Sequence, residues 1–205
     1  MTAQIPDTYI YHEDEYLFVA SEPRFYFDPK TLGIEPESIS SACWRGFWCT
    51  YEISNKGFVL KDLYIHTKDD KYPPINRSTS HIDVIDHVGI SGIAGATSFG
   101  NGGYRNYKEL SLPMDYTGNI LIGRNFLNHY YLHLGYQRFY TYELLVEIVV
   151  VNGKIIKMFD RSEIAKLVRE KIDATVKEFD IETDTATIIK HVKEEKSIGD
   201  IWWLK

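Results

Sequence analysis

The sequence predicts an α+β protein: a mostly antiparallel β-sheet, barrel-like or sandwich-like, with one short inserted helix and C-terminal helices packed on it. Over residues 1–159, runs rich in aromatic and β-branched residues alternate with turn residues, which is typical of strands. Two turn sequences, SNKG at 54–57 and NG at 152–153, each separate two such runs. From position 160 onward, apolar residues recur at helical spacing.

The 205 residues suffice for one large domain. We expect a single domain over residues 1–205, in which a β-rich body at 1–159 precedes a helical C-terminal segment at 160–205 with an apolar tail. The sequence leaves three arrangements of the sheet open: closure into a barrel, division into a sandwich, or an open sheet.

The first part of the chain is expected to form a hairpin followed by turns. Residues 8–12 and 16–20 read as two strands with a charged connection at 12–15. The stretch 21–40 contains three prolines and one glycine, so we expect mostly turns there. A short helix is expected at 35–41, with proline at its first position.

A second hairpin, at residues 42–66, organises the predicted sheet. If its turn carries a bulge, Ser54 lies opposite Phe58 and Tyr51 lies opposite Lys61. Alternation then divides the side chains between an apolar surface, which we expect to face the core, and a second surface.

The second surface is the candidate binding site. In this register Trp48 lies opposite Tyr64, and a glycine at position 46 leaves a hollow or lets another backbone approach closely. Aromatic walls beside polar groups suit a planar ligand, a sugar or a side chain of a partner protein. The alternative is that other elements cover this surface and its tryptophans belong to the core. The candidate binding residues are Trp44, Trp48, Asp62, Tyr64 and His66.

The rest of the chain continues this pattern. A glycine-rich stretch, Gly89 to Gly103, lacks the dinucleotide fingerprint and the P-loop lysine, so we expect a flexible loop or a lid. Asp160 and Glu163 are spaced as a capping box at a helix start. The apolar tail at 201–204 is expected to dock on the domain, the alternative being a partner-binding segment. The expected elements are strands at 80–87, 107–112, 116–122, 142–151 and 154–159, a short helix at 125–134, and helices starting at 160 and running over 185–196.

Two groups of side chains are weak candidates for a metal site. His129 and His133 lie four residues apart on the expected short helix, but no third ligand is marked and Tyr130 stands where H-E-x-x-H has its glutamate. The other group, at a strand end, is expected to be solvated instead. It consists of His81, Asp83, Asp86 and His87.

Evidence for catalysis is equally weak. Glu143 and Glu147 share one face of the 142–159 hairpin. An acid in such apolar surroundings could have a raised pKa and act as a general acid, and a salt bridge explains its position equally well. No serine lies in G-x-S-x-G and no Cys-His pair is marked. Whether the protein is an enzyme stays open, with the balance against it. We assign no catalytic residue, no metal ligand and no cofactor.

Charge and composition narrow the partners. The net charge of −6 argues against binding to nucleic acid or to an anionic membrane, and it is compatible with a basic protein partner. No apolar run is long enough to span a bilayer, and no secretion signal is present. The two cysteines, Cys43 and Cys49, are expected to lie about 20 Å apart on one extended strand, too far for a disulfide, so we expect free buried thiols. We expect a cytoplasmic protein, and the sequence does not specify its oligomeric state.

One stretch resembles a known pattern. The residues YTGNILIGRNFLNHYYLHLGYQ at 116–137 resemble an uncharacterised bacterial protein family, and the segments CWRGFWCTYEI and LKDLYI are similar to the same family. The resemblance covers most of the chain. It implies a bacterial cytoplasmic protein and carries over no functional residue.

Three functions follow from these observations. We expect a non-catalytic bacterial binding protein that acts through its aromatic surface, for example an immunity-type inhibitor of a basic toxin or effector. The alternative is a small-molecule-binding protein or enzyme, with a pocket between the Trp44, Trp48 and Tyr64 face and the Gly89–Gly103 loop. The third is a structural module that oligomerises through its apolar tail.

Overall fold

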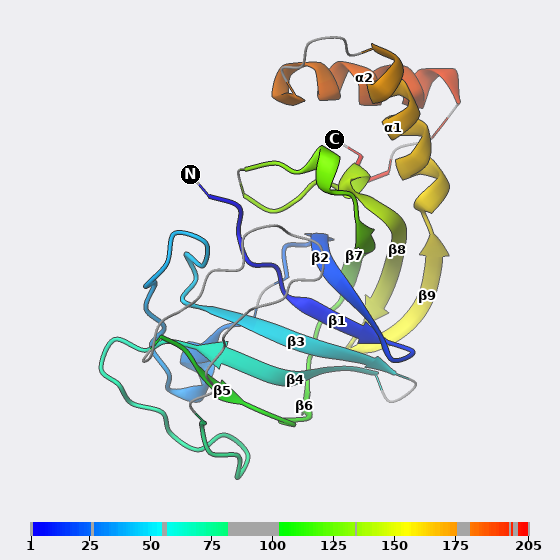
Figure 1. The fold of residues 1–205 in the computed structure, drawn as a ribbon. Coiled ribbons are helices and arrows are strands. Elements are labelled where there is room, and N and C mark those ends of the chain that lie inside the picture. Colours follow the sequence, from blue (N-terminus) through cyan, green and yellow to red (C-terminus); the bar gives the residue numbers. More distant parts are fainter. Residues whose placement is uncertain are drawn as a thin grey trace.

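The structure is a computed structural model that describes residues 2–25, 27–54, 57–81, 103–133, 135–175, 181–196, 198 and 201–204. Its described strands form one open, mostly antiparallel sheet of nine strands, with two helices at one end (Figure 1). This confirms the predicted α+β class, and of the three arrangements left open the sheet adopts the open one.

The strand order is β5-β4-β3-β1-β2-β7-β8-β9, and β6 pairs with β4. Every described pair is antiparallel except β1 with β3, which is parallel. The strands are β1 (Thr8–Tyr11), β2 (Asp14–Glu22), β3 (Phe47–Ser54), β4 (Gly57–Ile65), β5 (Arg105–Tyr107), β6 (Leu112–Pro113), β7 (Gly118–Phe126), β8 (Tyr142–Val151) and β9 (Lys154–Asp160).

The sheet is strongly curved, as Figure 1 shows. Three register shifts, in the β2–β7, β3–β4 and β8–β9 pairs, interrupt its ladders, and bulges of this kind bend a strand and increase its twist. The start of β4 lies beside the turn of the β8–β9 hairpin, where the N–H of Phe58 donates to the carbonyl of Gly153 at 2.9 Å.

Two larger clusters of buried side chains pack on the sheet. The main core contains residues from β1, β3, β4, β7 and β8, including the fully buried Tyr9, Tyr51, Leu63 and Ile122. The second cluster joins Leu121 and Leu145 of the sheet to the C-terminal helices. The second cluster therefore fixes the helices to the end of the sheet where β7 and β8 lie.

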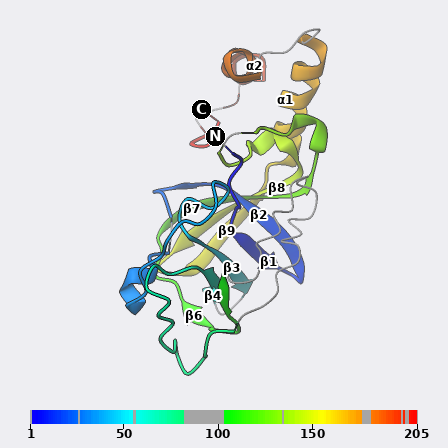
Figure 2. The same cartoon turned by 60° about the vertical axis from the view of Figure 1, so that its left-hand side comes forward.

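The C-terminal helices are α1 (Ser162–Thr175) and α2 (Ile181–Glu195), which Figure 2 shows beyond one end of the sheet. The Asp160 carboxylate accepts a hydrogen bond from the Ser162 N–H at 2.8 Å and so caps the start of α1, as the sequence predicts. The tail docks on the domain as expected, since Trp203 and Leu204 are buried in the second cluster.

Two expected helices are absent from the described residues. The segment 35–41 has no helical turn, and a short 3₁₀ helix lies earlier instead, at Pro29–Leu32. The expected helix at 125–134 is wrong as well. Strand β7 continues to Phe126, and only Asn128–Tyr130 forms a 3₁₀ turn. Asn125 has a positive φ of 56°, a conformation that interrupts regular structure.

The first hairpin has a shorter connection than expected. Tyr11 pairs with Asp14, so that only His12 and Glu13 form the turn. Both have a positive φ, 50° and 68°, which is the type I′ conformation whose twist matches a hairpin.

The register of the β3–β4 hairpin is confirmed in one half and wrong in the other. Trp48 pairs with Tyr64, as expected, but Ser54 pairs with Gly57 and Tyr51 with Leu60. The shift lies between Thr50 and Tyr51, so Leu60 faces the main core where the sequence placed Lys61. A charged side chain is costly to bury, and the bulge avoids that cost.

Candidate functional site

The candidate surface lies on the opposite face of the hairpin from the main core. Trp48 and Tyr64 are cross-strand partners whose rings stack, with centroids 5.0 Å apart and planes 6° apart. Tyr104 packs its ring edge on Trp48 at 4.8 Å. Trp48 is only 4% exposed and belongs to a small third cluster. The other buried members of this cluster are Ile5, Ala42, Cys43 and Tyr104.

The polar side of this surface is held by Lys108. Its ammonium lies 4.4 Å from the centre of the Tyr64 ring, donates a hydrogen bond to the Tyr64 hydroxyl, and is 4.0 Å from the Asp62 carboxylate. Asp62 is buried and also accepts a hydrogen bond from the N–H of Glu109 at 3.0 Å. Asp62 therefore fixes the segment after β5 against β4, which is a structural use of its charge.

His66 lies at the edge of the same surface. Its Nδ1 is 2.5 Å from the carbonyl of Gly103, so Nδ1 carries the proton of that hydrogen bond, and its Nε2 is 3.6 Å from the Glu37 carboxylate. Close approach accounts for the glycine at position 46, since a Cβ there would lie 2.5 Å from the Glu37 carbonyl oxygen. Of the two expected roles for Gly46, the structure shows the approach of another backbone.

Trp44 stands apart from the other four residues. It precedes β3, in the turn of residues 41–46, and its side chain is 53% exposed. Its backbone is held in place because the Trp44 N–H donates to Gln4 Oε1 at 3.0 Å, and the Gln4 amide donates to the Ser41 carbonyl at 2.8 Å. The structure thus brings together Trp48, Asp62, Tyr64 and His66 and leaves Trp44 on the surface.

A buried ion pair beside this surface was not found from the sequence. Asp7, 4% exposed, accepts two hydrogen bonds from the Arg45 guanidinium, at 2.8 and 3.0 Å, and a third from the N–H of Cys49. Burial alone would lower the pKa of Arg45, but the Asp7 carboxylate outweighs it and raises that pKa above its ordinary value. The pair ties the N-terminal segment to the turn that carries Trp44. No local pattern marks it, because its two residues meet only in the folded chain.

The cysteines are poor nucleophiles here. Cys43 and Cys49 are free and buried, as expected, but they do not share a strand, because Cys43 lies in the turn before β3. Burial raises the pKa of both thiols, which keeps them protonated at neutral pH.

Of the two histidine groups, the pair His129 and His133 does not form the arrangement considered above, and most of the other group is not described. His129 and His133 are both exposed and do not share a helix, and the His133 Nδ1 is 3.2 Å from the Tyr131 hydroxyl. His81 pairs through its backbone with Asn106. The other members of its group, Asp83, Asp86 and His87, lie outside the described residues, and so does the Gly89–Gly103 loop up to residue 102. Within the ranges that the structure describes, no three His, Cys, Asp or Glu side chains are grouped to hold a metal ion.

Glu147 takes part in a salt bridge and is not an isolated acid. Its carboxylate is 2.8 Å from Arg161 Nε, and it accepts hydrogen bonds from the indole N–H of Trp202 at 2.7 Å and of Trp203 at 3.5 Å. Of the two interpretations of this residue, the structure supports the ion pair. Glu143 is exposed and accepts a hydrogen bond from the Asn125 side chain.

Fold and site together define an α+β protein built on one curved, open sheet, with an aromatic cluster at the start of β3. Comparison with protein-family models, with curated proteins and with solved structures found no match. This result is consistent with the resemblance to an uncharacterised family. In the part of the chain that is described, no helix is both long and apolar enough to cross a membrane.

Proposed function

We propose that this protein is a non-catalytic binding protein of the bacterial cytoplasm, and that it recognises a protein partner through the aromatic surface at Trp44. The observation that carries the proposal is the exposure of the Trp44 side chain on a turn whose backbone is held by hydrogen bonds. Tryptophan is among the residues that contribute most to protein–protein binding energy, especially where it is placed before the partner arrives.

The turn is fixed from several sides. Besides the bond from Trp44 to Gln4, the N–H of Ile5 donates to the Ala42 carbonyl and the N–H of Gly46 donates to the Cys43 carbonyl. The stacked pair of Trp48 and Tyr64 lies on the strands that follow this turn and supports it from the sheet. A partner therefore meets a surface that needs little ordering, which favours affinity.

The same connecting segment carries a second exposed apolar side chain, Ile39, at 43%. Within this segment Glu35 is paired with Lys30, Glu37 lies by His66, and the whole chain has a net charge of −6. An exposed apolar contact on a negatively charged protein suits a basic partner, because opposite charges accelerate the encounter. An inhibitor of a basic toxin or effector is the concrete form of this proposal.

Two observations support a function without catalysis. Both thiols are buried with a raised pKa, and the buried carboxylate of Glu147 on β8 is neutralised by Arg161. The alternative of a pocket between the aromatic surface and the Gly89–Gly103 loop stays a prediction, since most of that loop lies outside the described residues.

Affinity capture from a lysate of the native host tests the proposal. Wild type, Trp44→Ala and Ile156→Ala serve as baits, and Ile156 is the matched control because it is 55% exposed on β9, beside the turn at the far end of β3. We expect a stoichiometric partner that Ile156→Ala retains and Trp44→Ala loses, and that elutes as salt is raised. A partner that Trp44→Ala retains in full would contradict the assigned surface.

A further inference from the structure

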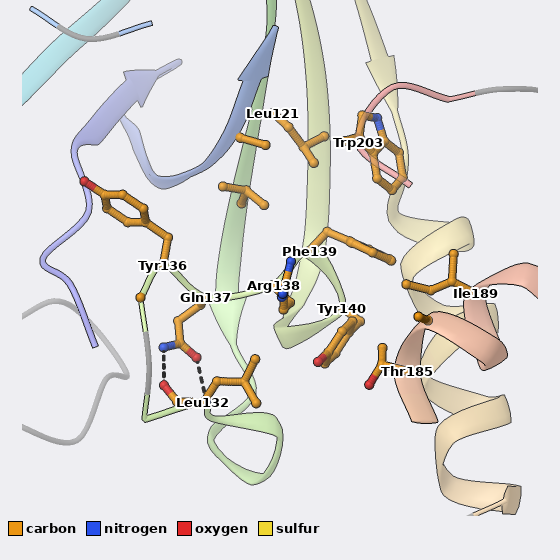
Figure 3. A pocket seen from close by; sticks show the side chains of 14 residues that line it. Leu121, Leu132, Tyr136, Gln137, Arg138, Phe139, Tyr140, Thr185, Ile189 and Trp203 are labelled. Carbon is orange, nitrogen blue, oxygen red and sulfur yellow. Dashed lines mark hydrogen bonds between the residues drawn. The ribbon is translucent and has the colours of Figure 1, made fainter. Parts of the chain in front are cut away.

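A pocket of about 450 Å³ lies between the sheet and the C-terminal segment. Figure 3 shows its lining side chains converging from four separate parts of the chain: the strands, the loop that leads to β8, helix α2 and the C-terminal tail. The volume lies within the range of roughly 300–1,000 Å³ that is typical of small-molecule sites. The pocket is separate from the Trp44 surface and does not depend on it.

The floor of the pocket is shaped by a β-bulge. The pairing of β2 with β7 shifts between Phe18 and Ala20, so that Val19 has no partner in the ladder. As a result the neighbouring residues Val19 and Ala20 both line the pocket, whereas successive side chains of a regular strand point to opposite faces. The small side chain of Ala20, beside the fully buried Leu121 of β7, leaves the floor hollow.

The walls are held by specific contacts. The Gln137 side chain donates to the carbonyl of Leu132 at 2.7 Å and accepts from the N–H of Leu132 at 2.9 Å, which fixes the loop beside the floor (Figure 3). On the other side the Trp203 ring packs against Phe139 with centroids 5.0 Å apart. These contacts give the pocket a defined shape without a ligand.

The charged side chain at the described lining of the pocket is an arginine. Arg138 lines the pocket with an exposed side chain, and among the lining residues that the structure describes there is no aspartate or glutamate. Across the described residues, the Arg138 side chain has no hydrogen-bond or ion-pair partner. Figure 3 shows this side chain in the middle of the apolar and aromatic lining. An arginine is always charged and prefers a carboxylate, which it can bind through two parallel hydrogen bonds.

We propose that this pocket binds a small apolar carboxylate. The apolar part of the ligand would lie on the floor formed by Val19, Ala20 and Leu121, and its carboxylate would pair with Arg138 at the mouth. The Ile189 side chain of α2 and the Trp203 ring of the tail would cover the apolar part. Because α2 and the tail form two of the walls, occupancy also stabilises the docked C-terminal segment by mass action.

Calorimetric titration of the full chain tests the site with defined probes. Octanoate represents an aliphatic carboxylate, 2-naphthoate an aromatic one, and 1-octanol has the octanoate chain without the charge. We expect saturable binding of at least one carboxylate, and for octanoate an affinity about tenfold or more above that of 1-octanol, as a charge-assisted pair provides. The absence of saturable binding by both carboxylates would overturn the proposal.

Variants assign any binding to this pocket. Arg138→Gln is expected to weaken carboxylate binding about tenfold and leave 1-octanol binding within about twofold, while Arg77→Gln, an exposed arginine elsewhere, changes neither. Ala20→Phe fills the floor and should abolish binding of every probe. If Ala20→Phe does not fold, Ala186→Trp narrows the pocket from the exposed side of α2. Equal carboxylate binding by wild type and Arg138→Gln, or unchanged binding in a folded pocket-filling variant, would overturn the proposal.

Discussion

Trp48 and Tyr64 stack face to face across β3 and β4, with ring planes only 6° apart. Because of this stacking, the Trp48 side chain is buried within the surface that the sequence predicts as a binding site. The indole of Trp48 therefore acts as the centre of a small cluster. Trp44, four residues earlier, is the tryptophan of this region that remains open to solvent.

The two tryptophans should respond differently to truncation. Trp48→Ala removes a buried, stacked ring and is expected to lower the free energy of unfolding by about 3 kcal/mol or more. Trp44→Ala removes a largely exposed side chain and should change it by less than about 0.5 kcal/mol. Chemical denaturation of both variants checks this, and a loss below 1 kcal/mol for Trp48→Ala would show that the cluster is open.

Gly46 should tolerate a side chain less well than Gly33. Both have a left-handed φ, +74° and +75°, but a Cβ at position 46 would lie 2.5 Å from a backbone oxygen of Glu37, and a Cβ at position 33 meets nothing within 4 Å. Gly33→Ala should therefore cost about 1 kcal/mol from backbone strain alone. We expect at least about 1 kcal/mol more for Gly46→Ala, measured by denaturation. Equal losses of unfolding free energy in the two variants would mean that the backbone at Glu37 shifts away from the new side chain without cost.

Glu147 should be needed for tail docking. Glu147→Gln leaves Arg161 without its carboxylate and weakens the acceptor of two indole N–H groups, so we expect a loss of about 3 kcal/mol in unfolding free energy. Faster amide exchange at residues 201–204 would accompany that loss. The control is Glu143→Gln on the same strand, since Glu143 is exposed and should cost less than about 0.5 kcal/mol. Unchanged exchange at the tail in Glu147→Gln would contradict the role assigned here.

Acid should remove the contribution of the α1 cap. Hydrogen bonds from Ser162 lower the pKa of Asp160 below its ordinary value of 3.8, so the folded state binds the proton less tightly than the unfolded chain. The stabilisation is present above pH 3.8 and is lost as the pH falls through the lowered pKa. Asp160→Ala should cost about 1 kcal/mol at pH 7 and less at pH 3. The comparison variant is Asp160→Asn, which keeps a capping oxygen without the charge. A loss of unfolding free energy in Asp160→Ala that does not change with pH would exclude this mechanism.

The parts of the fold that local patterns specify could be predicted. The β8–β9 hairpin follows from Asn152–Gly153, whose positive φ values of 50° and 71° are those of the preferred two-residue turn. The start of α1 follows from the cap at Asp160, and the docking of Trp203 follows from the cost of exposing two adjacent tryptophans to water. The turn and the cap depend on residues close together in the chain, and the docking depends on the apolar character of the tail.

The errors arose where distant contacts override local patterns. The 125–134 segment has helical spacing of its apolar residues, yet Phe126 pairs with Tyr142 at the end of the β7–β8 ladder, which keeps the first two residues of the segment in strand β7. In the β3–β4 hairpin, alternation from a bulged turn predicts a regular ladder, whereas the shift lies between Thr50 and Tyr51 and turns Leu60, in place of Lys61, toward the main core. A shift of one residue moves every following side chain to the other face.

Patterns along the chain suffice to predict the α+β class, the strand pairs joined by short turns, the capped α1 helix and the chemical character of the residues around Trp48. The folded chain is needed to see which tryptophan is exposed, how the sheet curves without closing, and that Arg138 lines a pocket with Val19, Ala20 and Trp203. The physical reason is that turns and caps depend on neighbours in sequence. The packing of distant segments determines which side chains are buried, which ion pairs form, such as Asp7 with Arg45, and where a pocket lies.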